Sequence, residues 1–420
     1  MTWQDWLLGW TWFVPLGILG VIRWISWAFR RIPAVLYRPV ENDFFLPLSI
    51  VVPVYKEDPE LFSAAIESWL ANDPGEIILV IDATDSVCQE IAARYPVTVV
   101  ITDVPGKRDA LRRGWEVAST PLVALVDSDT IWAPNVAAEV AKPFADPKVG
   151  GVGTRQNVYR TDNFLQRIND MFLDLRYFDE NPGQTYAARW VSCLSGRTAV
   201  YRREILLDIS ADFMSETFWG RPCMSGDDKR LTSLTMKRGY DTVLQRSARV
   251  WSTFPDTLKV FCKQRLRWAR NTWRSDLRAL GEGWAFRRPF LAYTMIDKAV
   301  SAFTLLVAPT YMIVGLATQR WSFCLALFLW WWLSRSVKLL PHLRRRPAHF
   351  FLMPAYTLMS FLMAVIKIWA LLTIRTQKWL TRPVQVTDSG EVVRTNEESE
   401  QDRAAAKAHA GGTQNAAGAA

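Results

Sequence analysis

Two aspartates separated by one residue, Asp127 and Asp129, close the apolar stretch PLVALVDSD. Acids at alternate positions of a strand end can share a hard cation such as Mg²⁺ or Mn²⁺, which also binds phosphate oxygens. The pattern Asp-x-Asp is common, and a solvated turn is its ordinary explanation. The buried strand that precedes it favours a metal and phosphate site here.

Asp82 ends a second apolar stretch, EIILVID, in the same way. Its carboxylate could bind a base or a ribose, or it could cap the next helix, as Thr84 and Asp85 could. Lys107 and Arg108 follow a Pro-Gly turn and could hold a diphosphate. Exposed Lys-Arg pairs are usually only solvated, so this assignment depends on the other motifs.

The paired acids Asp227 and Asp228 stand in the segment SGDDKRLT. Adjacent carboxylates in a confined site repel each other, which raises the proton affinity of one of them. One of the two could then act as a general base on an acceptor hydroxyl. A helix N-terminus, where Asp is favoured, explains the pair equally well. The motif by itself leaves both interpretations open.

The stretch QRLRW, Gln264 to Trp268, places two arginines beside an indole. A guanidinium matches phosphate oxygens, and an indole face suits the apolar side of a sugar ring. A basic anchor at a membrane surface is the alternative. Combined with a strand-end metal site and a candidate base, the cluster indicates the transfer of a group from a nucleotide diphosphate. The metal and the arginines would stabilise the negative charge of the departing diphosphate.

The elements that must position these residues have the pattern of a soluble α/β domain from about residue 46 to residue 275. The segments SIVVPVY, EIILVID, VTVVITD and PLVALVD are apolar strand candidates, and helical spacing separates them. Such alternation predicts a parallel sheet covered on both faces. Ligands of these sheets bind beyond the carboxyl ends of the strands, where the acids gather.

Composition indicates a membrane protein. Of the 420 residues 50% are hydrophobic, and the 21 tryptophans are too many for an average soluble domain. The net charge of +9 comes from basic residues at the edges of apolar runs. Because they form no continuous groove with stacking rings, nucleic-acid binding is disfavoured. The five scattered cysteines indicate reduced intracellular thiols.

Apolar runs predict the membrane segments. Trp6–Ile22 is an N-terminal span that can extend to Phe29, and the arginines behind it predict a cytoplasmic continuation. Ala299–Thr318 and Trp321–Pro341 are two further spans, and a third apolar run starts at Phe350. The predicted division is 1–45 (transmembrane helix and linker), 46–262 (catalytic domain), 263–298 (acceptor-side helices with an interfacial amphipathic segment), 299–382 (transmembrane or re-entrant helices) and 383–420 (disordered tail).

VIDATD, VDSDT, GDDKRLT and QRLRW, in this order, make the sequence resemble the processive, membrane-embedded family 2 glycosyltransferases, which include cellulose, chitin and hyaluronan synthases. The likeness extends from about Ser49 to Arg382. Hyaluronan synthases look closest and nodulation-type chitooligosaccharide synthases near, on GKRDAL, CLSGRTAVYRR and QRLRWARNTWRS. The resemblance implies an α/β, GT-A-like (Rossmann-type) mixed sheet with flanking helices, attached to transmembrane and interfacial helices.

The same resemblance implies a role for each donor-side candidate. Asp82 would contact the uridine and Lys107 would lie close to the nucleotide. Asp127 and Asp129 would bind the diphosphate and a Mg²⁺ or Mn²⁺ ion, with Asp129 the favoured metal ligand. Asp228 would be the catalytic base of an inverting displacement that forms no covalent intermediate.

On the acceptor side, the resemblance places Gln264, Arg267 and Trp268 near the diphosphate, where the polymer enters its channel, with Ser195 and Gly196 on a segment that faces the acceptor. Trp379, Thr381 and Arg382 would form a gating loop over the donor. The sequence departs from the family in three ways. Arg197 stands where proline is usual, Leu380 replaces a glycine, and one N-terminal span is visible where two are common.

The expected function is polymerisation of a polysaccharide from UDP-GlcNAc, UDP-GlcA or both, with passage of the chain through the lipid bilayer of the plasma membrane. The alternatives are a chitin- or glucan-type synthase and an enzyme that adds one sugar to a lipid carrier. A catalytically dead membrane scaffold would have no reason to keep clustered acids. Because Trp379–Arg382 must reach a cytoplasmic donor, Phe350–Ile374 is expected to be re-entrant or to lie along the cytoplasmic interface.

Overall fold

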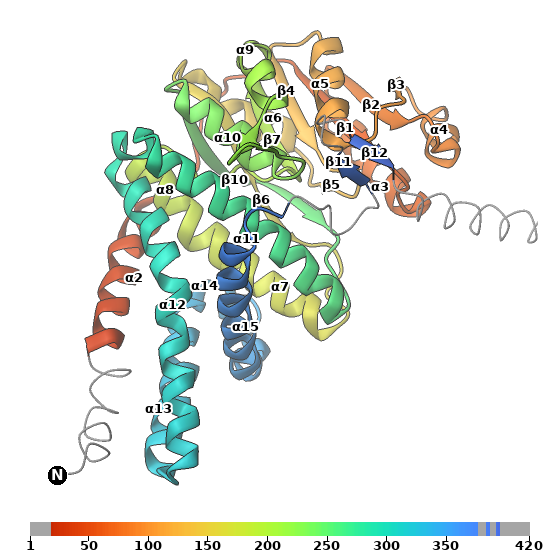
Figure 1. The fold of residues 1–420 in the computed structure, drawn as a ribbon. Helices are drawn as coiled ribbons and strands as arrows, with labels where there is room; N and C mark the ends of the chain where they lie inside the picture. Colours follow the sequence, from red (N-terminus) through yellow and green to blue (C-terminus); the bar gives the residue numbers. More distant parts are fainter. Residues whose placement is uncertain (1–17, 377–383, 387–391, 395–420) are drawn as a thin grey trace, which may run out of the picture.

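A mixed sheet of eight strands with helices on both faces forms the centre of the protein (Figure 1). The computed structural model describes residues 18–376, 384–386 and 392–394. The strand order is β3-β2-β1-β4-β7-β6-β10-β5. The strands are β1 Leu48–Val54, β2 Glu76–Asp82, β3 Thr98–Thr102, β4 Leu122–Val126, β5 Ile131–Trp132, β6 Val149–Val158, β7 Thr198–Arg202 and β10 Asp241–Ser252.

The four apolar stretches become β1 to β4, and these strands run parallel as expected. The parallel arrangement does not extend to the whole sheet, because β7 runs antiparallel to β4 and β6, and β5 runs antiparallel to β10. A mixed sheet with flanking helices is the fold class that the family resemblance implies, and the structure confirms it.

Helices cover the sheet and extend away from it. Around the sheet lie α3 Pro59–Leu70, α4 Ser86–Ala92, α5 Lys107–Val117, α6 Val136–Ala141, α7 Phe164–Leu175, the π-helix η3 Arg176–Glu180, α8 Asn181–Ala188, α9 Arg203–Met214, α10 Asp227–Lys237 and α11 Leu258–Gly281. The remaining helices are α2 Leu19–Leu36, α12 Pro289–Ala317, α13 Trp321–Lys338, α14 Leu340–Leu343 and α15 Met353–Leu372. Two small hairpins pair β8 Thr217–Phe218 with β9 Arg221–Pro222 and β11 Val384–Val386 with β12 Val392–Arg394.

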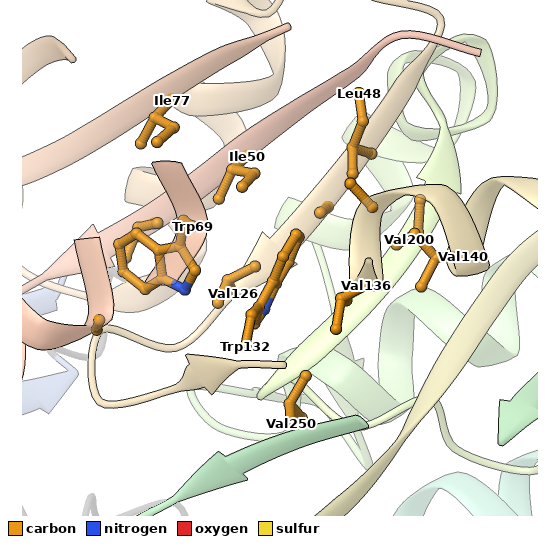
Figure 2. Packing of buried hydrophobic residues seen from close by; sticks show 14 of the residues in the cluster. Leu48, Ile50, Trp69, Ile77, Val126, Trp132, Val136, Val140, Val200 and Val250 are labelled. Atoms are coloured by element: carbon orange, nitrogen blue, oxygen red, sulfur yellow. The ribbon is translucent and has the colours of Figure 1, made fainter. Parts of the chain in front are cut away.

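Successive residues of β1 contribute to two separate cores. Ile50 belongs to the core that contains Trp69 and Trp132 (Figure 2). Val51 belongs to the core on the opposite face, which contains Trp115. Because side chains alternate across a strand, a strand that is covered on both faces must be apolar throughout. Burial of each such side chain contributes roughly 1.5–3 kcal/mol, which fixes the sheet edge that carries the acids.

The antiparallel strand β7 brings a distant loop to the carboxyl edge of β4. Val126, the last residue of β4, is in register with Thr198, the first residue of β7. Residues just before β7 therefore lie beside residues just after β4. This pairing sets the segment Ser195–Arg197 next to Asp127, whose backbone N–H donates to the Arg197 carbonyl at 3.4 Å.

One continuous helix, α11, carries QRLRW and most of the segment that was expected to be interfacial. The predicted domain boundary at 262/263 lies inside this helix. The segment Arg270–Arg288 is not a single surface helix, because α11 ends at Gly281 and both Trp273 and Trp284 are buried. Trp273 donates through Nε1 to the carbonyl of Lys367, which joins α11 to α15.

Within the part of the chain that the structure describes, two helical segments could cross a membrane by length and composition, Pro289–Ala317 and Pro347–Leu372. The first extends away from the sheet together with α2 and α13 (Figure 1). The second segment differs, because the chain at both of its ends packs against helices of the sheet domain. Met353 packs in one cluster with Ile168 of α7, and Ile374 packs in another with Trp273 of α11.

The arginines that follow the N-terminal apolar run are held inside the helical bundle. Arg23 lies 2.6 Å and Arg30 3.5 Å from the carboxylate of Asp297 on α12. Arg31 lies 3.6 Å from Asp179 of η3. These ion pairs join α2 to α12 and to η3. The sequence predicts only that the arginines mark a cytoplasmic boundary.

The contact between α5 and β1 gives a test of the packing. A Cβ atom added at Gly114 would lie 2.1 Å from Cγ1 of Val51, a stiff side chain in the core. We expect Gly114→Ala to reduce stability by about 1–3 kcal/mol through overpacking. Gly281→Ala is the matched control, because no atom lies within 4 Å of its added Cβ. Thermal unfolding in detergent measures both, and an unchanged midpoint for Gly114→Ala would contradict the packing described.

Candidate active site

A cavity of about 680 Å³ opens at the carboxyl edge of the sheet, between the β4 and β7 ends and the helices α10 and α11. Most of the predicted site residues line it, although they come from five separate segments of the chain. The predicted residues that line it are Lys107, Asp127, Asp129, Ser195, Gly196, Asp228, Gln264, Arg267 and Trp268.

Lys107, the first residue of α5, bridges two carboxylates of the cavity. Its Nζ lies 2.5 Å from Asp127 and 3.1 Å from Asp227. Burial alone would lower the pKa of Lys107, but the two carboxylates outweigh it and raise that pKa. Burial raises the pKa of Asp127, with Lys107 opposing and Asp129 reinforcing the effect. The ammonium therefore stays charged where a diphosphate could bind.

Gly196 makes the approach of Lys107 possible. A Cβ at this position would lie 3.1 Å from the Lys107 Nζ and 3.6 Å from the Asp228 Cβ. Its neighbour Ser195 is buried, and its carbonyl accepts the N–H of Thr198 at 3.2 Å. The segment before β7 thus forms a tight wall between the donor-side cation and the candidate base.

Asp129 is held by the end of β10. Its Oδ2 accepts hydrogen bonds from Ser252 Oγ at 3.0 Å and from Thr253 N at 3.2 Å and Oγ1 at 2.5 Å. Asp127 and Asp129 both line the cavity, and carboxylate oxygens are ligands that Mg²⁺ and Mn²⁺ prefer. Asp227 and Asp228 add further negative charge there, so a divalent cation fits the donor chemistry and the charge of this end.

Asp228 lies in the first turn of α10, with its side chain at the cavity. Its Oδ1 accepts from the Lys229 backbone N–H at 2.7 Å, and its Oδ2 accepts from the Cys193 thiol at 3.6 Å. Gly226, with φ of 88°, makes the turn that begins the helix, and an added Cβ there would meet Asn271 at 2.9 Å. A larger residue at 226 would push α10 away from α11.

The two paired acids have different surroundings. Asp227 belongs to the ion pair with Lys107 and is not free to exchange a proton at neutral pH. Burial would raise its pKa, but Lys107 and Arg108 lower it. Asp227 is therefore not the acid of the pair whose proton affinity is raised. Both acids line the cavity, but Asp227 is paired with Lys107, whereas Asp228 accepts from the Lys229 N–H and the Cys193 thiol.

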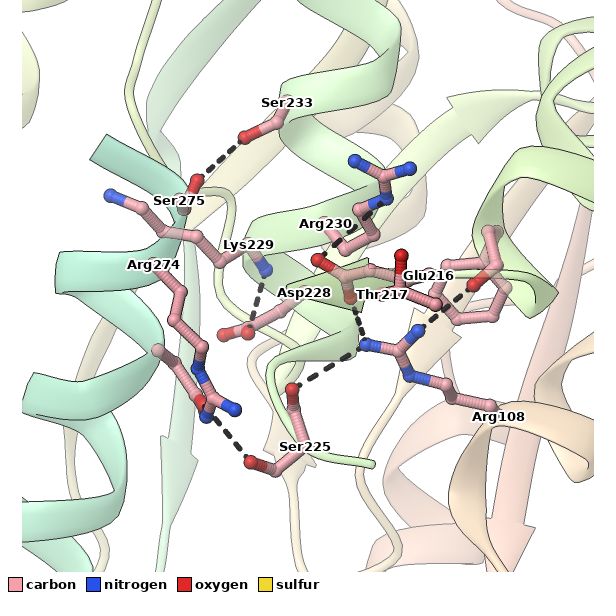
Figure 3. A network of polar contacts seen from close by, with 12 residues as sticks. Arg108, Glu216, Thr217, Ser225, Asp228, Lys229, Arg230, Ser233, Arg274 and Ser275 are labelled. Atoms are coloured by element: carbon pink, nitrogen blue, oxygen red, sulfur yellow. Dashed lines mark hydrogen bonds and ion pairs between the residues drawn. The ribbon is translucent and has the colours of Figure 1, made fainter. Parts of the chain in front are cut away.

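A buried ionic network supports the loop that precedes α10 (Figure 3). Glu216 forms ion pairs with Arg108 and Arg278, and the Arg278 pair is 2.5 Å long. Burial would raise the pKa of Glu216, but the surrounding arginines lower it. Arg108 also donates to the carbonyls of Phe213 at 2.8 Å and Ser225 at 3.4 Å. Arg108 thus holds the loop before α10, and because it is not among the described residues that line the cavity, its contact with a diphosphate stays a prediction.

Arginine and aromatic side chains form a second wall of the cavity, which we call the acceptor wall after its predicted role: Arg197, Phe254, Arg265 and Trp268. The guanidinium of Arg197 lies 4.2 Å from the Phe254 ring and 5.4 Å from the Trp268 ring. Arg265 lies 4.8 Å from the same indole. Burial, together with the charges of Arg197 and Arg176, lowers the pKa of Arg265 to about 9. This end of the cavity therefore has a surplus of positive charge that an anionic group would relieve.

The cavity continues toward the helices that extend from the sheet domain. Glu180 of the π-helix η3 pairs with Lys298 of α12 at 3.0 Å. Met363 and Lys367 of α15 line the same end. π-helical turns are frequent at functional sites, and here η3 also contributes Arg176 to the lining. The cavity thus has one end at the sheet and a second end at α12 and α15.

Two parts of the prediction lie elsewhere. Asp82 is buried at the end of β2 and accepts from Thr84 N at 3.0 Å and Oγ1 at 2.6 Å. It is not among the described residues that line the cavity, so its contact with a base stays a prediction. Trp379, Thr381 and Arg382 lie outside the described residues. The chain that leads to them leaves α15 near α11, where Arg270 donates to Thr373 at 2.9 Å.

Sequence reasoning missed Cys193, Arg176 and Lys229 as lining residues. Arg197 was noted only as a departure from a family pattern. Cys193 could have been suspected, because it stands two residues before the Ser-Gly segment. Arg176 and Lys229 gave no signal, since their place in the cavity depends on how α7 continues into η3 and how α10 packs on α11.

Comparison with known proteins agrees with this geometry. Residues 47–271 match the family model described as "Glycosyltransferase like family 2". An N-acetylglucosaminyltransferase of Rhizobium meliloti is 30% identical over 83% of this chain and 84% of its own length. A hyaluronan synthase of Streptococcus pyogenes is 29% identical over 87% of this chain and 91% of its own.

The fold also matches a solved structure. A mannosyltransferase from Pyrobaculum calidifontis, in complex with GDP-Man and Mn²⁺, superposes with a TM-score of 0.56. It is 19% identical and covers 86% of this chain and 97% of its own. At this identity the likeness concerns the fold alone, and it supports the GT-A-like architecture.

The contact between Cys193 and Asp228 can be tested by thiol labelling. Burial and the charge of Asp228 raise the pKa of Cys193 to about 12, so very little thiolate exists at pH 8. We expect iodoacetamide to label Cys193 about a hundredfold or more slower than an ordinary thiol. Asp228→Asn removes the charge, lowers that pKa and should speed labelling several-fold.

Asp73→Asn, which removes an exposed carboxylate in the turn after α3, is the control and should leave the rate unchanged. Site-resolved mass spectrometry gives the rates. A Cys193 that labels like a free thiol, with no response to Asp228→Asn, would contradict the arrangement of thiol and carboxylate described here.

Proposed function

This chain belongs to the family 2 glycosyltransferases, and we propose that it is a membrane-embedded, inverting enzyme that polymerises a polysaccharide from UDP-sugars. The donors would be UDP-GlcNAc, UDP-GlcA or both. The observation that carries this proposal is the shared cavity. Asp228, the acids Asp127 and Asp129, and the QRLRW residues line one space that continues to α12 and α15.

The proposed reaction is a single displacement. Asp228 takes the proton of an acceptor hydroxyl as its oxygen attacks the anomeric carbon of the donor. The bond from that carbon to the diphosphate oxygen breaks, and UDP leaves with the electron pair, so the configuration inverts. Lys107 would hold the departing diphosphate by its charge. Asp127 and Asp129 would bind a Mg²⁺ or Mn²⁺ ion, which neutralises phosphate charge when present.

The acceptor wall supports repeated transfer. The Trp268 face can pack on the apolar side of the terminal sugar, and the guanidinium groups of Arg197 and Arg265 lie 5.4 and 4.8 Å from the indole centroid and help to hold the ring in place. After each transfer the new end must move one sugar toward α12 and α15, where Lys298 and Lys367 line the path. An enzyme that adds one sugar to a lipid carrier would need no such continuation.

The position of α15 supports a cytoplasmic catalytic domain at the plasma membrane. Both ends of this helical segment pack on the catalytic domain, so the chain can reach residues 377–383 without a further crossing. We propose that α12 and α13 cross the bilayer and that α15 lies re-entrant or along the cytoplasmic interface. A C-terminal tag that is accessible only from outside intact cells would contradict this topology.

A donor panel tests the activity. Purified protein with Mg²⁺ or Mn²⁺ would receive UDP-GlcNAc, UDP-GlcA and UDP-Glc singly and in pairs, with UDP release and product length as readouts. We expect long products in one of two cases. Long products from UDP-GlcNAc alone would indicate a chitin-like polymer, and long products that require UDP-GlcA as well would indicate hyaluronan. Release from UDP-Glc alone would favour a glucan, and products limited to one added sugar would contradict polymerisation.

Asp228→Asn is the decisive variant in the same assay. Loss of a general base is expected to reduce turnover by about 10²–10⁴-fold, while the protein still binds UDP. Asp162→Asn, an exposed acid before α7, is the control that should keep full turnover. Undiminished synthesis by Asp228→Asn would remove this residue from the role of base.

A further inference from the structure

Three guanidinium groups surround the ring of Phe178 on the π-helix η3. The Cζ atoms of Arg155, Arg246 and Arg345 lie 4.7, 5.2 and 4.5 Å from the ring centroid. They come from β6, β10 and the turn after α14. A fourth guanidinium, that of Arg31, donates to the Phe178 carbonyl at 2.7 Å. Three cations thus contact one ring and a fourth contacts the backbone of the same residue, which is not among the described residues that line the cavity.

Adjacent strands add to this concentration of charge. Arg249 of β10 is in register with Arg155 of β6, and a register shift between Gln245 and Arg249 places it there. Like charges opposite each other on neighbouring strands are destabilising. The Nε atoms of Arg155 and Arg249 are buried and have no hydrogen-bond partner in the described part of the chain. Guanidinium groups without such partners favour a nearby anion.

The nearby acids Asp170 and Asp174 offset only part of this positive charge. Asp174 pairs with Arg345 and lies 2.5 Å from His342, and Asp170 lies 3.9 Å from Arg346. Among the residues that the structure describes, no carboxylate lies within ion-pair distance of Arg155, Arg246 or Arg249. Burial and the charges of Arg345 and Arg249 lower the pKa of Arg155 to about 10, which agrees with a surplus of positive charge.

A bound cation does not explain the cluster. Ligand atoms of Asp170, Asp174 and His342 lie within 4.8 Å of one another, a spacing that could hold a metal. However, the Asp174 oxygen that faces His342 also accepts from the Arg345 guanidinium. A metal would have to displace that arginine and enter a region of positive potential. The charge of the region favours an anion instead.

The cluster adjoins the end of α2, the helix that leads to the N-terminus (Figure 1). Tyr37, which follows α2, donates to the Leu244 carbonyl at 2.7 Å, and its ring lies 5.2 Å from the Arg246 guanidinium. One stripe of α2 is both apolar and exposed at helical spacing: Val21, Ile22, Ile25, Phe29, Ile32, Val35 and Leu36. An apolar stripe that ends beside unpaired arginines matches a ligand with acyl chains and an anionic head.

We propose that Arg155, Arg246 and Arg249 bind the phosphate of an anionic phospholipid whose acyl chains lie along the exposed stripe of α2. Guanidinium groups bind phosphate oxygens through paired, charge-assisted hydrogen bonds, which would satisfy the buried Nε atoms. The bound lipid would tie α2 to β6, β10 and η3, and η3 also lines the catalytic cavity. The proposal requires that the chain lies at a membrane, but it does not depend on which sugar is transferred.

Lipid binding to the full-length protein in neutral detergent tests the proposal. Short-chain phosphatidylglycerol, short-chain phosphatidylcholine and inorganic phosphate would be titrated separately, with the unfolding midpoint as the readout. We expect phosphatidylglycerol to raise the midpoint and phosphatidylcholine to leave it unchanged. In Arg155→Gln/Arg249→Gln the apparent affinity for phosphatidylglycerol should fall about tenfold or more. Arg94→Gln/Arg160→Gln, which removes the same charge from exposed positions, should retain wild-type affinity.

The remaining outcomes each decide the question. Equal affinity for phosphatidylglycerol in both double variants would overturn the site. Inorganic phosphate that binds as tightly as the lipid would overturn the lipid as its ligand. If the first double variant does not fold, photo-crosslinking of the wild type with an anionic lipid probe replaces it. Crosslinks at Ile32–Tyr37 support the site, and crosslinks confined to α12 and α13 overturn it.

Discussion

The ion pairs of Lys107 are the interaction on which the catalytic site depends. One ammonium joins the first turn of α5 to Asp127 after β4 and to Asp227 at the start of α10. Without it, carboxylates from separate segments would face one another in the cavity and repel. The same charge also suits a diphosphate, so the group that makes the apo site stable can hold the donor. In the proposed function, the stability of the site and the binding of the donor both depend on this one side chain.

A second set of contacts determines where an acceptor could lie. Arg197 contacts the rings of Phe254 and Trp268, and Arg265 contacts the same indole from its own helix. The arginine that departs from the family pattern therefore has a structural place that proline could not fill. It ties the segment before β7 to α11, and it adds a cation to the end of the cavity that would receive sugar and phosphate.

Much of the fold and of the site could be predicted from the sequence, because the relevant signals were local. Apolar runs gave β1 to β4, and acids directly after such runs fell at the cavity, as Asp127 and Asp129 do. Long-range contacts could not be predicted. The antiparallel course of β7, the contact of Cys193 with Asp228 and the return of α15 to α11 depend on tertiary packing. Asp82 has the same local pattern as Asp127, yet its strand ends away from the cavity lining.

A structure of the purified protein with a UDP-sugar and Mn²⁺, determined by electron cryo-microscopy, tests the central claim most directly. The account predicts diphosphate density beside Lys107, metal density at Asp127 and Asp129, and a sugar ring between Asp228 and Trp268. A nucleotide bound at another surface, with this cavity empty at saturating donor, would contradict it.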